Sequence, residues 1–241
     1  MKTIIGASLL LVSAVSYGHI FHDHDYEKVE TKNLTLATSD LSRFMIEAGA
    51  GSLEVIGHDE ATIKVTAEVY QKEKGAPYCL SLEDKGSKGK LEANSCHNDN
   101  DTRIDLTVYV PSELKTQISD GSGSISIENA SISQINDGSG EIVIADNATD
   151  LMINDGSGPI RIHNQKGKLD INDGSGSIWV QDVEGDVRLK DGSGSIDVSN
   201  IAGEVSVSDG SGSISVDNAH NFILLGDGSG SVNVSNVERL K

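Results

Sequence analysis

The apolar residues of the C-terminal half recur in pairs separated by one polar residue, and the pairs return at a fixed spacing. Two sets follow this rule, one running from Ile125 and Ile127 to Val232 and Val234, the other from Leu151 and Ile153 to Ile223 and Leu225. Such alternation is the period of a β-strand, and β-branched residues suit its inward-facing positions. The pattern predicts two short strands in each repeat unit.

A tetrapeptide marks each unit. Asp-Gly-Ser-Gly starts at Asp120, Asp137, Asp155, Asp173, Asp191, Asp209 and Asp227. The spacing is 17 residues once and then 18 residues five times, and a second Asp or Asn follows nine residues after each Asp. Asx side chains bond nearby backbone N–H groups and glycine accepts positive φ, so both positions predict tight turns.

One such unit cannot bury its apolar pairs alone, whereas units stacked about 4.8 Å apart share them. The expected fold is therefore all-β: a flattened parallel β-solenoid, of the β-helix or β-roll kind, with 18-residue coils and two short strands per coil. Right-handed winding is the default for parallel crossovers.

The rest of the chain divides by composition. We expect a signal peptide at 1–18, a polar His- and Asp-rich linker with a first strand at 19–39, and the solenoid at 40–241. Residues 48–55 match a repeat unit without its Asp, which predicts a degenerate first coil. An insertion at 66–112 then precedes the regular repeats at 120–241. Strong alternation at 62–70 and 103–110 predicts long strands, arranged as a hairpin-like cap over the N-terminal edge.

The first residues have the pattern of a secretory signal and predict export. Lys2 precedes an apolar run at 4–15 that is too short to span a membrane. The expected location is the periplasm, the cell surface or the medium, with no membrane span. In such an oxidising compartment Cys79 and Cys96 predict a disulfide between the arms of the insertion, with free thiols as the alternative. The net charge of −18 argues against nucleic acid as a partner.

Three segments carry a resemblance to a known family. These are Gly-Ser-Leu-Glu-Val at 51–55, the strand Val-Tyr-Val-Pro at 108–111 that leads into the first repeat, and the train of Gly-Ser-Gly-Ser-Ile units. Together they resemble a family of bacterial envelope proteins of unknown function that carries the name adhesin. The resemblance implies a solenoid fold and brings no catalytic residues with it.

The seven repeated Asp residues should stack in one column. Two interpretations fit this column: each carboxylate caps its own turn, or cations such as Ca²⁺ lie between coils. In the calcium-binding β-roll an Asp stands two residues before the apolar position, and that place is apolar here, as at Ile125. Turn capping is therefore preferred and no cofactor is expected, with Ca²⁺ as the alternative.

Two further groups of residues are candidate ligand contacts. His19, His22 and His24 would bind Cu(II) or Ni(II) if cleavage leaves a free amine two residues before His19, or else belong to a loose linker. Trp179, the only Trp, occupies an outward offset beside polar residues and could stack on a sugar, or be an ordinary exposed aromatic.

Phe222 and Leu224 also fall at outward offsets. This apolar spot predicts cover by the C-terminal tail or by a second subunit, and self-association through the C-terminal end of the solenoid. The sequence 98–101, Asn-Asp-Asn-Asp, lacks the Gly and Glu of a calcium loop and predicts a solvated turn.

No catalytic signature motif occurs, so the leading interpretation is a non-catalytic envelope or surface protein that binds a glycan or a protein, or assembles with itself. The alternatives are a periplasmic cation-binding or envelope-stress protein and a polysaccharide-acting solenoid enzyme. An ordered-surface binder could use the serine column Ser124, Ser177, Ser195, Ser213 and Ser231, but Glu141 and Pro159 interrupt it.

Overall fold

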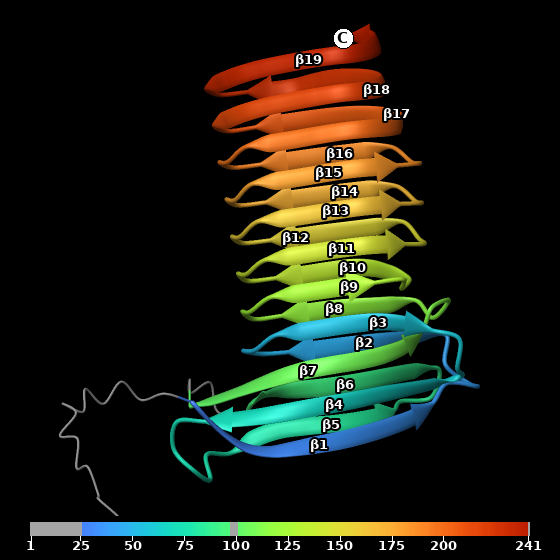
Figure 1. Ribbon diagram of the computed structural model, residues 1–241, viewed down its shortest axis with the longest axis vertical. Coiled ribbons are helices and arrows are strands. Elements are labelled where there is room, and N and C mark those ends of the chain that lie inside the picture. The colour runs from blue at the N-terminus through green and yellow to red at the C-terminus, as the bar shows by residue number, and fades with distance from the viewer. Residues whose placement is uncertain (1–25, 97–100, 241) are drawn as a thin grey trace, which may run out of the picture.

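The computed structural model describes residues 26–96 and 101–240 and shows a single stack of β-coils (Figure 1). The proposed signal peptide, the three histidines of the linker and most of the 98–101 turn lie outside these residues. Within the described ranges, no helix has the length and apolar character needed to cross a bilayer.

The N-terminal part, up to the end of the insertion, contains β1 (Glu27–Ala37), β2 (Arg43–Ala48), β3 (Leu53–His58), β4 (Thr62–Gln71), β5 (Tyr78–Asp84), β6 (Lys88–Ser95) and β7 (Thr102–Pro111). The following strands are β8 (Thr116–Asp120), β9 (Ile125–Glu128), β10 (Ile132–Asp137), β11 (Ile142–Asn147), β12 (Leu151–Asp155), β13 (Ile160–Gln165), β14 (Leu169–Asp173), β15 (Ile178–Val183) and β16 (Val187–Asp191). The last coils contain β17 (Ile196–Asp209), β18 (Gly212–Asp227) and β19 (Gly230–Leu240).

Each coil contributes one strand to each of two parallel ladders. In one ladder β11 pairs with β13 in the register Ile142↔Ile160, and in the other β12 pairs with β14 in the register Ile153↔Ile171. These four residues are fully buried, like most inward Ile, Val and Leu residues of the stack. The parallel β-solenoid predicted from the 18-residue period is therefore confirmed.

The two corners of each coil use different backbone devices. At the first corner the second glycine of Asp-Gly-Ser-Gly has positive φ, for example +150° at Gly194. At the second corner the Asp or Asn itself is left-handed, with φ between 52° and 58° at all seven positions. The Asx residues at this corner also form ladders, such as Asn200 Nδ2 donating to Asp182 Oδ1 at 2.8 Å.

The N-terminal part extends both ladders with antiparallel strands. The predicted first coil is present as β2 and β3, and Leu53 lies opposite both Leu106 of β7 and Ile125 of β9. The predicted long strands are observed as β4 and β7, which pair antiparallel, and β1 pairs antiparallel with β4. On the other ladder β5 pairs antiparallel with β6, and β6 pairs parallel with β2. These strands lie together at the N-terminal end of the stack (Figure 1).

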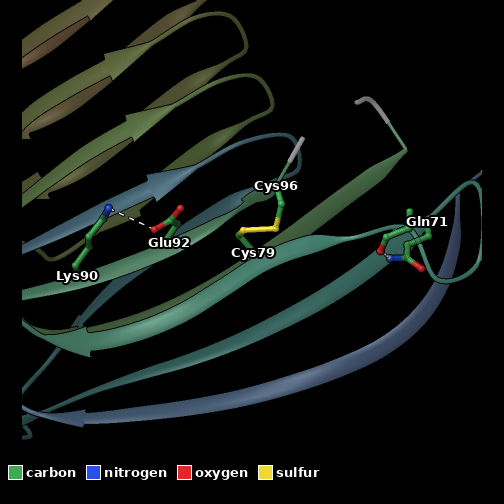
Figure 2. The surroundings of a disulfide bond; sticks show 6 residues. Gln71, Cys79, Lys90, Glu92 and Cys96 are labelled. Carbon is green, nitrogen blue, oxygen red and sulfur yellow. Dashed lines mark hydrogen bonds and ion pairs between the residues drawn. A yellow bond between two sulfur atoms is a disulfide. The ribbon is translucent and has the colours of Figure 1, made fainter. Parts of the chain in front are cut away.

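Figure 2 shows how the insertion is held. A disulfide bond joins Cys79 of β5 to Cys96, which follows β6. Beside it, Gln71 closes the turn between β4 and β5: its Oε1 accepts from the Gly75 N–H at 2.8 Å and its Nε2 donates to the Ala76 carbonyl at 2.6 Å. Both polar atoms of the buried Gln71 side chain are thus bonded to the local backbone.

The prediction that Phe222 points outward is wrong. Phe222 lies opposite Val205 of β17 and is 3% exposed, whereas Leu225, predicted inward, is 56% exposed. The register shifts by one residue after Ala219 and shifts back at Leu225, so the two irregularities cancel and the Asp spacing stays at 18 residues. Phe222 therefore belongs to the core and cannot be a subunit contact. Leu224 lies opposite the buried Val207, on the same face as Phe222, so its predicted outward position is also wrong. It is 37% exposed, and its role as a contact stays a prediction.

Candidate functional sites: the aspartate ladder and the Trp179 groove

The aspartate ladder consists of the first six repeated Asp residues. Parallel register places each one directly opposite the next, as in Asp137↔Asp155 and Asp173↔Asp191. Each stands at the end of its strand on the same face as the core residues, and the six side chains are 4–8% exposed (Asp120, Asp137, Asp155, Asp173, Asp191 and Asp209). Asp227, in the last coil, is exposed. The repeat thus places a row of carboxylates along one edge of an apolar core.

Turn capping, the preferred interpretation of these residues, is what the hydrogen bonds show for five of them. Oδ1 accepts from the backbone N–H of the serine two residues on, at 3.1–3.3 Å, for Asp137, Asp155, Asp173, Asp191 and Asp209. The other oxygen, Oδ2, is buried and has no hydrogen-bond partner in any of these five. In Asp120 both carboxylate oxygens are buried and unpartnered.

This arrangement disfavours ionised carboxylates. Burial, followed by repulsion from ladder neighbours, raises the pKa of Asp120 to about 7 and those of Asp155 and Asp191 to about 6. Burial also raises the pKa values of Asp137 and Asp173. Two unit charges at the strand spacing of about 4.8 Å repel by about 3–4 kcal/mol at an effective dielectric constant of about 20. Full ionisation of the ladder would therefore strain the stack.

A calcium site has little support from this geometry. Ca²⁺ takes 6–8 oxygen ligands, whereas five of the six ladder carboxylates leave a single oxygen uncommitted and Asp120 leaves two. Among residues 26–96 and 101–240, no group of three or more His, Cys, Asp or Glu side chains is arranged to hold a metal ion. Binding of Ca²⁺ to the ladder stays an untested prediction.

The Trp179 groove lies on the outer face of β11, β13, β15 and β17. Its volume is about 440 Å³, and Trp179, 37% exposed, lines it together with several polar side chains (Arg161, His163, Gln181, Asp197 and Ser199). Parallel register puts Arg161 and Asp197 directly beside Trp179, one coil to each side. The outward position predicted for Trp179 is thus observed, with hydrogen-bonding groups on both sides.

Arg161 fixes one side of this groove. Its guanidinium carbon lies 4.4 Å from the centre of the Trp179 ring, a cation–π geometry, and the guanidinium also pairs with Glu141. His163 is held too, because its Nδ1 lies 3.3 Å from Asp182 Oδ2. On the other side of the ring, Asp197 forms no ion pair with a described residue. Carboxylate and amide groups there can exchange hydrogen bonds with a ligand.

The opposite ladder forms a second groove of about 490 Å³. Met152, 47% exposed, lies in it among charged side chains, including Lys168, whose Nζ is 3.4 Å from Asp186 Oδ2. This groove contains no aromatic ring. The two outer faces therefore differ in what they can recognise, although the same repeat builds both.

A third cluster, at the N-terminal end of the stack, was not predicted. The Arg103 guanidinium carbon lies 4.5 Å from the centre of the Tyr70 ring and 5.5 Å from that of Tyr26. Tyr70 also donates to Glu68 Oε2 at 2.9 Å, and Lys28 pairs with Glu68 at 2.6 Å. Tyr26 directly precedes β1 and the other residues lie in β1, β4 and β7, so only the antiparallel registers of these strands reveal that they meet. Alternation alone places Glu68 and Tyr70 on an outer face without naming their neighbours.

Solved structures similar to this chain come from bacteria. A "putative cell adhesion protein" from Clostridium sporogenes is 13% identical, with 88% of this chain and 99% of that chain covered and a TM-score of 0.37. A "putative adhesin" from Bacteroides fragilis is 13% identical (88% and 97% covered, TM-score 0.33). A "putative lipid binding protein" from Parabacteroides distasonis is 12% identical (88% and 96% covered, TM-score 0.31). Likenesses at this level carry no argument about ligand or activity.

No curated protein matches the chain significantly. One family model does match, described as Toastrack DUF4097, and it spans residues 41–239. The match runs from the first coil through the insertion to β19, which is the same region that the family resemblance of the sequence covers. This chain belongs to the Toastrack DUF4097 family.

Proposed function

We propose that this protein is a non-catalytic component of a bacterial envelope or surface that binds a carbohydrate through the Trp179 groove. The observation that carries the proposal is a Trp ring standing in an outer groove between polar side chains on a rigid sheet. A sugar ring presents an apolar C–H face and a rim of hydroxyl groups, so it needs both surfaces at once.

The groove offers these surfaces in adjacent coils. The Trp179 ring supplies apolar area at a small entropic cost, since its side chain has two rotatable bonds and is held by Arg161. Asp197 and Gln181 lie in the same groove and can accept from or donate to hydroxyl groups. Because the backbone beneath is a continuous ladder, the site is preorganised and little ordering is needed on binding.

Trp179 is also the only Trp of the chain, so its fluorescence reports on this groove alone. We expect a glycan array to identify a ligand, and titration of that ligand to shift the Trp179 emission. The variant Trp179→Ala should lose at least tenfold in affinity, measured by calorimetry. Met152→Ala, on the opposite face, is the matched control and should bind like the parent protein.

Two results would contradict the proposal. One is a ligand whose affinity is the same for the parent protein and Trp179→Ala, which would place binding elsewhere. The other is the absence of any carbohydrate ligand together with capture of a defined envelope protein, which would favour the protein-binding alternative. The enzyme and envelope-stress alternatives have no comparable feature among the described residues to carry them.

A further inference from the structure

The aspartate ladder contains buried acceptors that no described group uses. The side chains of its six members are 4–8% exposed, and every member leaves Oδ2 buried and without a hydrogen-bond partner. Buried polar atoms are rarely left unpartnered, because an unmade hydrogen bond costs free energy. The regular recurrence of the same orphan atom in six coils points to a ligand that the ladder binds.

The groups that face each carboxylate are other carboxylates. Asp155 of β12 interacts electrostatically with Asp137 of β10 and Asp173 of β14. Asp191 of β16 interacts in the same way with Asp173 and with Asp209 of β17. Within residues 26–96 and 101–240, no Lys, Arg or His forms an ion pair with a ladder carboxylate. The ligand must therefore bring the positive charge.

The coordination available limits what that ligand is. A metal ion needs several converging oxygens, and every coil of the ladder except that of Asp120 offers a single uncommitted oxygen at an apolar edge. A proton needs one oxygen and removes the charge at the same time, which also removes the repulsion between neighbouring coils. Where carboxyl groups lie close together in a buried site, desolvation and mutual repulsion favour the neutral form.

We propose that the aspartate ladder is a proton-binding site in which the orphan carboxylates of successive coils each take up a proton, so that the folded solenoid gains protons in mild acid. Each step is a simple protonation: a carboxylate and a proton give a neutral carboxyl group, and no other bond is broken. The site makes the stability of the coil stack respond to the pH outside the cell membrane.

The sign of the response follows from linkage. The pKa values of Asp155 and Asp191, about 6, and of Asp120, about 7, lie above the unfolded value of about 4. Between pH 4 and 7 the folded chain therefore binds more protons than the unfolded chain, and the associated stability is fully present below pH 4 and is lost as the pH rises through 6 to 7. Refolding at pH 5.5 should take up about two to three protons.

The test compares isosteric neutral variants. In Asp155→Asn/Asp191→Asn two central carboxylates become uncharged, whereas Asp227→Asn changes the exposed member of the same column. We expect the melting temperature of the parent protein and of Asp227→Asn to fall as the pH rises from 5 to 8. The double variant should show a flatter profile and should melt above the parent protein at pH 8.

A direct titration keeps the proposal testable even if the double variant folds poorly. In the parent protein labelled with ¹³C at the Asp side-chain carboxyl, NMR should show several carboxyl groups that titrate above pH 5. Ladder resonances that all titrate below pH 4.5 would overturn the proposal. A rise in melting temperature with millimolar Ca²⁺ at pH 7.5, reversed by a chelator and absent in the double variant, would also overturn it in favour of a metal site.

Discussion

The substitution Gly194→Ala tests the stacked backbone most directly. A Cβ at Gly194 would lie 1.5 Å from the carbonyl oxygen of Gly176 in the preceding coil, and the residue has a φ of +150°. To reach 3.0 Å the two coils would have to separate by about 1.5 Å, against a spacing of about 4.8 Å. Two bonds span this gap, from Gly176 N–H to the Ser193 carbonyl at 3.0 Å and from Gly192 N–H to the Asp173 carbonyl at 3.1 Å, and both would weaken or break.

The expected cost combines two terms of similar size. Two backbone hydrogen bonds contribute about 1 kcal/mol each, and a non-glycine residue in this backbone region costs about 1–3 kcal/mol. Gly194→Ala should therefore lower the free energy of unfolding by about 3–5 kcal/mol, measured by urea denaturation followed by circular dichroism.

The matched control is Gly226→Ala, where an added Cβ would meet only Ser208 Oγ at 3.6 Å. This variant should stay within about 0.5 kcal/mol of the parent protein. The contrary result is that Gly194→Ala unfolds at the same urea midpoint as Gly226→Ala, with the same dependence of the unfolding free energy on urea. That result would refute the argument that close backbone stacking requires glycine at the Asp-Gly-Ser-Gly corner.

Three further predictions concern other parts of the stack. Ile171→Ala, in the dry centre, should cost about 3–4 kcal/mol in chemical denaturation, whereas the outward Asp170→Ala on the same strand should be nearly neutral. Asn200→Val should lower the melting temperature more than Asn200→Gly, because φ is 58° there; equal effects would contradict this reason. Reduction of the Cys79–Cys96 bond, which joins residues 17 positions apart, should lower the free energy of unfolding by about 3 kcal/mol. A thiol reductant should therefore lower the melting temperature of the parent protein but not that of Cys79→Ser/Cys96→Ser.

Much of the coil could be predicted from the sequence because one rule repeats. The alternation at Ile142 and Ile144 fixes which side chains face inward, and the Asp spacing fixes the length of the coil. The rule fails at Phe222, because a one-residue shortening after Ala219 is compensated by the extra residue Leu225. The spacing between Asp209 and Asp227 is unchanged, so counting residues cannot detect the shift.

The candidate sites were predictable to different degrees. The outward position of Trp179 follows from strand alternation, but the contact with Arg161 depends on a cation–π geometry that spacing does not specify. Stacking of the Asp residues also follows from the period. The burial of these Asp residues could not be predicted, because an Asp at a turn is ordinarily solvated. Each one is buried because it is the last residue of its strand and lies on the face that packs against the core. The Tyr70–Arg103 contact required the antiparallel register of β4 and β7.

The parallel register that aligns each coil with the next has a consequence for size. Since a regular coil contacts only its two neighbours, removing or adding one unit of 18 residues would change the height of the molecule by a single strand spacing and leave both ends intact. A lineage could therefore adjust how far the Trp179 groove stands from the N-terminal insertion by duplicating or deleting whole units, with no redesign of either part.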